Sequence, residues 1–302
     1  MKAIEVDNMC KRYGDVKAVA DFSFHVEKGE LLALVGPDGA GKTSIFRALC
    51  NLIDYDSGEI RILGYDQRTQ FEIVKPLLGY MPQTFSLYPD LSVEENLSFY
   101  AGLFGITRDQ LEKRKARLYE FSGLGPFAGR RALQLSGGMK QKLALSCNLV
   151  HEPEVLILDE PTTGVDPLSR RQFWNILKSL KEGGAAIVVS TPYMDEVALA
   201  DRAIFIYDGK KLTEGTPKEL LRQFGANVYR ADIFPTSERM NDLSKIDGIT
   251  ARRFGSSIHL YTDRKHPIES LGEALVGVGI KQDMLERIDP ELEDVFIQLM
   301  GQ

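Results

Sequence analysis

The sequence contains few cysteines and histidines. It has three cysteines, Cys10, Cys50 and Cys147, and four histidines in 302 residues. An odd number of widely spaced cysteines fits neither a disulfide framework nor a CxxC metal site, so we interpret them as reduced and mostly buried thiols. This pattern argues against a small disulfide-stabilised secreted protein and gives no indication of zinc.

Long apolar runs and an excess of positive charge are also absent. No run approaches the ~18 to 20 apolar residues that cross a bilayer, and the first ten residues lack the apolar centre of a signal peptide. Lysine and arginine number 37 against 43 aspartates and glutamates, a formal net charge of −6. This balance argues against a surface built to grip nucleic acid or anionic lipid. We therefore expect a cytoplasmic chain with no nucleic-acid partner and no direct membrane insertion.

What the sequence does contain is an ordinary globular composition, with 43% hydrophobic and 26% charged residues. Its length allows one large domain and one small domain. Short apolar runs at 31–35, 155–158, 185–189 and 203–207 alternate with helical patterns. This alternation is typical of an α/β fold built on a parallel sheet.

The pattern changes twice along the chain. Residues 94–105 and 107–123 are helical in pattern, and we interpret them as part of a helical insertion at about 84–150. After a helix that begins at Thr216 and Pro217, the pattern changes again at Gly225. We predict a first domain over 1–225 and a small α+β domain over 226–302. The elements expected in the small domain are strands at 228–233 and 257–262 and helices at 267–278 and 290–300.

A glycine-rich loop joins the first apolar run to a helix. It fits the pattern G-x-x-x-x-G-K-[ST] in its required strand, loop and helix setting. Its members are Gly36, Pro37, Asp38, Gly39, Ala40, Gly41, Lys42, Thr43 and Ser44. The glycines allow backbone N–H groups to turn toward phosphates, Lys42 can reach the β- and γ-phosphate oxygens, and Thr43 can bind Mg²⁺. The loop predicts a nucleoside triphosphate site, in which Asp38 must point to solvent to avoid repelling the phosphates.

Two carboxylates follow the second apolar run. Asp159 can hold Mg²⁺ through water, and Glu160 can polarise an attacking water. Without the phosphate loop, a solvated acidic turn after a strand would be the better interpretation. With it, the two segments predict nucleotide hydrolysis.

A third motif, Leu135-Ser136-Gly137-Gly138, begins a helix that runs through Asn148. Ser136 is placed as the N-cap, and the two glycines expose amides at the positive end of the helix dipole, which makes a second anion site. At this point the sequence closely resembles the ATP-binding subunits of ABC (ATP-binding cassette) transporters, whose defining motif is LSGG. The resemblance covers roughly residues 1–225.

The resemblance implies a P-loop cassette with a parallel-sheet core, N-terminal antiparallel strands, a helical insertion, and ATP and Mg²⁺ as cofactors. It makes Tyr13 the ring that stacks on adenine, Gln83 a residue that contacts Mg²⁺ and the attacking water, and Asp166 part of a loop that crosses to a partner subunit. From the residues alone, a half-buried strand tyrosine, a solvated amide and an Asp-Pro turn remain the alternatives.

In this family two cassettes pair head to tail, so each ATP lies between one phosphate loop and the partner's LSGG helix. The resemblance therefore implies an ATPase with a second cassette as partner. It gives Lys42, Gln83 and Glu160 catalytic roles and makes Thr43, Gln83 and Asp159 the residues around the metal.

One position departs from the family pattern. Where a switch histidine normally holds the γ-phosphate, this sequence has Pro192 after Thr191, and proline has no donor. We expect Thr191 to cap a helix with Pro192 at its first position. Losing one preorganised donor typically costs ~10² to 10³ in rate, so we predict a slow half-site around Lys42 and Glu160. Because LSGG is intact, a heterodimer with a cassette that keeps its histidine is a further hypothesis.

Three segments resemble subunits of multidrug-efflux exporters: residues 85–97, the LSGGMKQK segment at 135–142 and residues 292–296. This resemblance implies a separate membrane permease and a position on the inner face of the cell membrane. Phe85, Leu87 and Tyr88 either line a groove for a permease helix or belong to the core. The basic run 113–117 is interpreted as a solvated helix face.

Two other function classes stay open. A soluble ABC ATPase acting on ribosomes or DNA usually has tandem cassettes or long coiled-coil insertions, and this chain shows one cassette and no sustained heptads. A small-molecule kinase would share the phosphate loop but would not explain LSGG. The transport interpretation is therefore favoured.

Overall fold

The computed structural model describes residues 1–263, 268 and 272–300. The chain divides into two compact units, Met1–Pro217 and Lys218–Gln302. Among the described residues, no helix is both long enough and apolar enough to span a membrane.

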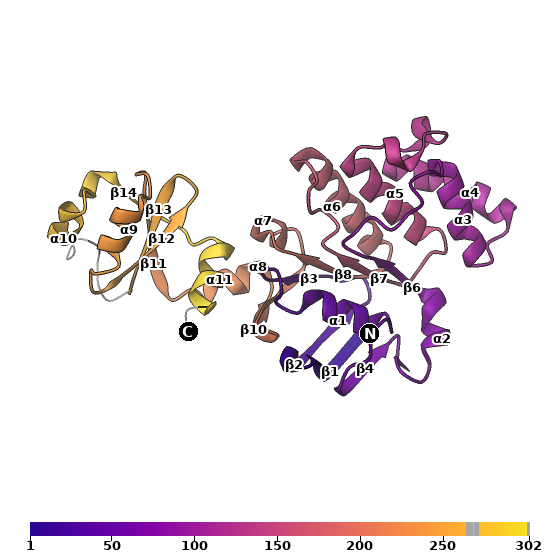
Figure 1. Cartoon of the computed structure of the whole chain (residues 1–302), viewed down its shortest axis with the longest axis horizontal. Helices are drawn as coiled ribbons and strands as arrows, with labels where there is room; N and C mark the ends of the chain where they lie inside the picture. Colours follow the sequence, from indigo (N-terminus) through magenta and orange to yellow (C-terminus); the bar gives the residue numbers. More distant parts are fainter. Residues whose placement is uncertain (264–267, 269–271, 301–302) are drawn as a thin grey trace. The chain divides into compact units, whose positions relative to one another are not determined.

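A six-stranded sheet forms the centre of the first unit (Figure 1). Its order is β10-β9-β3-β8-β7-β6, and all neighbours pair in parallel except β10, which is antiparallel to β9. The strands are β3 (Leu31–Val35), β6 (Leu78–Met81), β7 (Val155–Asp159), β8 (Ala186–Thr191), β9 (Arg202–Tyr207) and β10 (Lys210–Gly215). Every residue of β3, β7 and β8 is buried, as expected for parallel strands covered on both faces. The predicted α/β fold is confirmed.

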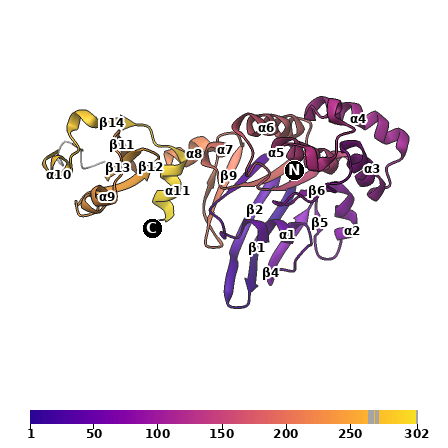
Figure 2. The same cartoon turned by 45° about the horizontal axis from the view of Figure 1, so that its top comes forward.

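A second, antiparallel sheet has the order β2-β1-β4-β5. Its strands are β1 (Lys2–Tyr13), β2 (Val16–Glu27), β4 (Ser57–Ile62) and β5 (Tyr65–Asp66). Figure 2 shows β1, β2 and β4 running side by side. A shared apolar core, including Phe22, Phe46 and Ile157, joins this sheet to helix α1 (Lys42–Leu49) and to the parallel sheet. The core fixes the phosphate loop between the two sheets.

Helices cover the other side of the parallel sheet (Figure 1). Two of them begin with capping boxes, Ser92 with Glu95 and Thr107 with Gln110, which satisfy the free N–H groups of the first turn. The α-helices of this unit beyond α1 are α2 (Phe71–Val74), α3 (Val93–Leu103), α4 (Arg108–Ser122), α5 (Gly137–Leu149), α6 (Pro167–Glu182) and α7 (Met194–Val197). Short 3₁₀ turns lie at Lys75–Leu77, Gly125–Phe127 and Ala132–Gln134. The helices predicted at 94–105 and 107–123 lie within two residues of α3 and α4.

The second unit contains a four-stranded antiparallel sheet of order β12-β13-β11-β14. Its strands are β11 (Ala226–Ala231), β12 (Ile249–Phe254), β13 (Ser257–Asp263) and β14 (Leu285–Ile288). Its helices are α8 (Pro217–Arg222), which begins at the unit boundary, α9 (Ser237–Leu243), α10 (Gly272–Gly277) and α11 (Leu292–Met300), with a 3₁₀ turn at Gln282–Met284. The sequence pattern did not indicate β12, β14 or α9. Of the helix predicted at 267–278, residues 267 and 269–271 lie outside the described residues.

Candidate functional site

The phosphate loop connects the end of β3 to the start of α1, and two of its glycines are sterically required. Gly41 has φ 106°, and a Cβ atom there would lie 2.4 Å from the carbonyl oxygen of Ala18. A Cβ atom on Gly36 would lie 2.2 Å from the carbonyl oxygen of Ile206. Both contacts are with backbone, which cannot move aside cheaply, so only glycine fits at either position. Asp38 is exposed, as the phosphate-site prediction requires.

Lys42 lies at the centre of the site and is 4% exposed. Its ammonium donates hydrogen bonds to the carbonyl oxygens of Gly36 (2.8 Å) and Pro37 (3.0 Å). It also forms an ion pair of 3.0 Å with Glu160, which is 5% exposed. A buried pair of this kind is held in place by its extra hydrogen bonds, which offset the cost of removing two charges from water.

Glu160 joins three segments that are far apart in sequence. The side-chain amide of Gln83 donates to one oxygen of Glu160 at 2.9 Å, and the hydroxyl of Thr163 lies 3.3 Å from the same oxygen. Glu160 itself has φ 48°, a left-handed backbone conformation that is uncommon for residues other than glycine. The structure therefore brings together Lys42, Gln83 and Glu160, which follow the carboxyl ends of β3, β6 and β7 in the same parallel sheet.

Asp159 is 1% exposed and differs from Glu160 in its partners. One carboxylate oxygen accepts a hydrogen bond from the hydroxyl of Ser190 at 2.7 Å, whereas Oδ2 is buried with no hydrogen-bond partner among the described residues. Burial raises the pKa of Asp159, and the hydroxyls of Ser190 and Thr43 partly oppose that shift, which places Thr43 beside this carboxyl group.

Ser190 is a residue that the sequence analysis did not single out. Its hydroxyl donates to Asp159 and accepts the backbone N–H of Glu160 at 2.9 Å, so one buried side chain orients both carboxylates. Ser190 could have been identified only from the register of the parallel strands, which pairs Asp159 with Ser190 across β7 and β8. This register is set by tertiary packing and cannot be read from the sequence.

Tyr13 lies at the end of β1 with 47% of its surface exposed. Its hydroxyl is 3.4 Å from the hydroxyl of Ser44, and the ammonium of Lys11 is 5.0 Å from its ring centroid. A partly exposed ring beside the phosphate loop is available for stacking, and the stacking of Tyr13 on adenine stays a prediction.

The LSGG helix begins as predicted. Ser136 is the N-cap of α5 and accepts the backbone N–H of Met139 at 3.4 Å. Close packing against α6 also requires glycine at position 138, which the sequence did not indicate. A Cβ atom on Gly138 would lie 2.5 Å from the side chain of Ser169. Across the described part of the chain, no hydrogen bond or ion pair connects residues 136–138 to the phosphate loop.

Asp166 is the N-cap of α6, where its carboxylate accepts the N–H of Ser169 at 2.9 Å. This hydrogen bond lowers the pKa of Asp166. The Asp-Pro helix start is therefore present, and a role toward a partner subunit stays a prediction.

The predicted arrangement around Pro192 is wrong in one respect. Pro192 is not the first residue of a helix capped by Thr191: β8 runs through Thr191, Tyr193 is the N-cap, and α7 begins only at Met194. The hydroxyl of Thr191 accepts the N–H of Tyr193 at 3.0 Å and donates to Glu196 at 2.5 Å. Thr191 is therefore the last residue of β8, and its hydroxyl links the turn at Tyr193 to the buried carboxylate of Glu196.

Glu196 is 1% exposed and forms the centre of a buried polar cluster beside the site. It accepts hydroxyl hydrogen bonds from Thr191 and from Thr162 (2.7 Å), and the guanidinium of Arg170 lies 3.6 Å away. Arg170 also lies 4.1 Å from the ring centroid of Tyr193. The cluster ties the segment after Glu160 to the end of β8, and the sequence analysis missed it because its members lie in three separate segments.

Three features define a nucleotide-binding P-loop protein with a cassette architecture: a glycine-rich phosphate loop after β3, two carboxylates at the end of β7 in the same sheet, and a capped LSGG helix. Comparison with known proteins agrees. The ABC transporter family model matches residues 19–163. This chain belongs to the ABC transporter family.

Three relatives show how far the similarity extends. The chain is 42% identical, over 99% of its length and 52% of the relative, to a probable multidrug ABC transporter ATP-binding protein, YbhF of Escherichia coli. It is 35% identical to Nod factor export ATP-binding protein I of Rhizobium etli, covering all of this chain and 94% of the relative. It is 32% identical to linearmycin resistance ATP-binding protein LnrL of Bacillus subtilis, covering 99% and 98%. The chain thus spans about half the length of the first of these relatives and nearly all of the other two.

Solved structures of ABC ATP-binding cassettes share the fold of this chain. An ATP-binding subunit of an ABC transporter matches with a TM-score of 0.67 and 30% identity over 74% of this chain and 93% of that one. The ATP-binding cassette MJ0796, solved as a dimer bound to ADP and Pi, matches with a TM-score of 0.64 and 25% identity over 70% of this chain and 98% of that one.

Proposed function

We propose that this chain binds and hydrolyses ATP as the energy-coupling subunit of an exporter, and that ATP-driven pairing of two cassettes powers a separate membrane permease. Relatives named for multidrug transport, Nod factor export and linearmycin resistance support the exporter assignment. The observation that carries hydrolysis is the convergence of Lys42, Gln83 and Glu160, in which Gln83 donates to the buried Lys42–Glu160 pair from the exposed side. We assign the cassette to 1–225 and a small accessory domain to 226–302.

The cluster suggests how nucleotide binding prepares catalysis. Lys42 is paired with Glu160 at 3.0 Å, and the phosphates of ATP are stronger and more numerous anionic partners for the same ammonium. When Lys42 turns to the β- and γ-phosphate oxygens, Glu160 loses its ion pair and becomes free to accept a proton from the attacking water. Gln83, already 2.9 Å from Glu160, is placed to orient that water.

The residues also fit a magnesium ion. The buried Asp159 Oδ2 has no partner among the described residues, and a hard divalent cation prefers an oxygen ligand of this kind. Thr43, Gln83 and Asp159 would hold the ion, and bound Mg²⁺ would neutralise charge on the β- and γ-phosphate oxygens. Tyr13 would stack on the adenine.

The LSGG helix is assigned to the ATP of a second cassette. Ser136, Gly137 and Gly138 make no polar contact with this chain's own phosphate loop within the described residues. Their amides at the N-terminus of α5 would therefore bind the γ-phosphate held by the partner, with Asp166 in the loop that reaches across. Because Pro192 offers no donor, the half-site built on Lys42 hydrolyses slowly, and a partner cassette that retains its histidine supplies the faster site.

Exposed apolar side chains mark a candidate permease-docking surface. Tyr88 (48% exposed), Phe99 (38%) and Leu103 (65%) lie on α3 and the loop before it, and the rings of Tyr88 and Phe99 pack edge to face at 4.6 Å. Leu87, in contrast, is core at 5% exposed. Docking through this patch would hold the chain peripherally on the inner face of the cell membrane.

Purification from native membranes together with an activity measurement tests the proposal. We expect a permease and a second cassette to co-purify. We expect the chain purified without that second cassette to hydrolyse ATP slowly, and this slow hydrolysis should fall to background when Glu160→Gln is introduced. Recovery with ribosomes or DNA and without a permease would instead support the soluble ABC ATPase. A purified homodimer that hydrolyses ATP rapidly, and loses that activity with Glu160→Gln, would contradict the slow half-site.

A further inference from the structure

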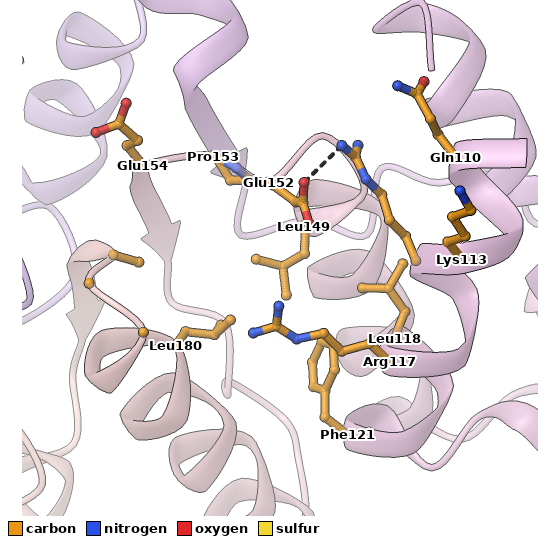
Figure 3. Close-up of a pocket in the computed structure, with 14 residues that line it drawn as sticks. Gln110, Lys113, Arg117, Leu118, Phe121, Leu149, Glu152, Pro153, Glu154 and Leu180 are labelled. Atoms are coloured by element: carbon orange, nitrogen blue, oxygen red, sulfur yellow. Dashed lines mark ion pairs between the residues drawn. The ribbon is translucent and has the colours of Figure 1, made fainter. Parts of the chain in front are cut away.

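A groove of about 700 Å³ lies between α4 and the loops that precede β7 and β8 (Figure 3). One wall is a face of α4, and the other is made by residues 152–154 and 183–185. The strands β3, β7 and β8 are parallel, the phosphate loop follows the end of β3, and Glu160 follows the end of β7. The groove is therefore at the opposite edge of the sheet from the nucleotide site.

Two cations of the basic run on α4 are already neutralised. Lys115 is buried and pairs with Glu94 at 2.6 Å and Glu112 at 2.8 Å. Arg114 donates to the carbonyl oxygen of Val150 at 2.7 Å and pairs with Glu152 at 2.8 Å across the groove. These contacts anchor α4 and give both residues structural roles.

The other two cations of the basic run have no anionic partner within the described residues. Lys113 and Arg117 line the groove four residues apart on one face of α4, and neither has a hydrogen bond or ion pair within the described chain. The two carboxylates of the opposite wall are both engaged, Glu152 with Arg114 and Glu154 with Lys28 at 2.6 Å. The groove therefore presents two positive charges that its own residues do not neutralise.

The surface between the walls is apolar. Figure 3 shows Arg117 pointing from α4 toward Leu149 and Leu180, with Phe121 on the same helix. Leu149 is buried, and Leu180 and Phe121 are half-buried. A volume of about 700 Å³ falls within the roughly 300 to 1,000 Å³ of small-molecule sites, which combine apolar walls with a few charged groups.

We propose that this groove binds a small amphipathic anion, in which a phosphate or carboxylate group pairs with Lys113 and Arg117 and an apolar body covers Leu149, Leu180 and Phe121. The two cations would bind the anionic group of the ligand, and the apolar side chains would bind its apolar part. The site is separate from the nucleotide site and does not depend on ATP binding.

Calorimetric titration of the full chain with decyl phosphate, kept below its micelle concentration, tests the proposal. All variants carry Lys42→Ala, which weakens the competing anion site in the phosphate loop. We expect one decyl phosphate per chain and affinity at least tenfold above that of inorganic phosphate or decanol. Arg117→Ala should weaken binding roughly tenfold or more, because it removes a charge-assisted contact. The matched control Arg108→Ala, on the same helix and outside the groove, should leave the affinity unchanged.

Three outcomes would overturn the proposal. Equal binding by the Arg117→Ala and Arg108→Ala variants would show that the groove does not hold the anion. Binding of decanol as tight as that of decyl phosphate would leave only a non-specific apolar surface. Co-sedimentation with phosphatidylglycerol vesicles that depends on Arg117, without binding of monomeric decyl phosphate, would assign these cations to a membrane surface instead.

Discussion

The substitution Ser190→Ala examines whether one hydroxyl orients both carboxylates of the site. Ser190 is fully buried, donates to Asp159 at 2.7 Å and accepts the N–H of Glu160 at 2.9 Å. Alanine fits the same space and removes only the oxygen atom. A carboxylate oxygen and an amide N–H are then left buried without these partners.

The expected loss of stability follows from those two groups. Leaving a buried polar group unsatisfied costs about 1 to 3 kcal/mol, so the loss of partners for two such groups should lower the free energy of unfolding by roughly 2 to 6 kcal/mol. As a matched control, Ser146→Ala removes a buried hydroxyl that donates only to the carbonyl oxygen of Lys142, and it should cost about 1 kcal/mol.

The pH dependence provides a second readout. Burial raises the pKa of Asp159 above its ordinary value, and the Ser190 hydroxyl lowers it again. A carboxyl group whose folded pKa is raised binds more protons in the folded state, so its contribution to stability falls as pH rises toward the folded pKa. Ser190→Ala raises that pKa further. The destabilisation should therefore be smallest near pH 4, close to the ordinary pKa of an aspartate, and should grow as pH rises through the folded pKa.

Urea denaturation of both variants at several pH values measures these quantities. A stability loss equal to that of Ser146→Ala, with no dependence on pH, would refute the bridging role of Ser190.

Three further predictions concern neighbouring positions. Pro192→His should raise ATP turnover of the chain's own half-site by roughly 10²-fold by restoring a transition-state donor, and an unchanged steady-state rate would contradict the slow half-site. Gly138→Ala should destabilise the fold by about 1 to 3 kcal/mol in thermal unfolding, because its Cβ atom would lie 2.5 Å from Ser169, while Gly137→Ala, with its nearest atom at 3.7 Å, should be tolerated. Glu196→Gln should lower the free energy of unfolding by about 1 to 3 kcal/mol, because it removes a buried carboxylate that accepts two hydroxyl hydrogen bonds; no change in urea denaturation would rule out the cluster as a structural support.

The features that the sequence predicted well are local. The phosphate loop follows from glycine spacing, and the helix starts at Ser136 and Asp166 follow from side chains that cap their own helices. Continuous apolar runs indicated β3, β7, β8 and β9 of the parallel sheet, whereas the short strand β6 was not indicated. In each case the information lies within a few consecutive residues.

The features that were missed depend on strand register or on packing between distant segments. Ser190 acts on Asp159 only because β7 and β8 pair in one register, and Gly138 is constrained by Ser169 only because α5 packs on α6. The capping role predicted for Thr191 failed because β8 continues through Thr191 and α7 begins only at Met194, so the Thr191 oxygen accepts the N–H of Tyr193, which lies before the helix. In the second unit, β12 and β14 are partly exposed strands without the apolar runs that indicate a buried strand.

The most direct test of the account is the association state of the Glu160→Gln chain, which should retain ATP without hydrolysing it. Light scattering would be measured with and without ATP and Mg²⁺, alone and with the cassette that co-purifies from native membranes. The account predicts monomers without nucleotide and a two-cassette complex with ATP, which is lost when Ser136→Arg blocks the LSGG helix. A mass that ATP leaves unchanged in both mixtures would contradict the claim that ATP is held between two cassettes.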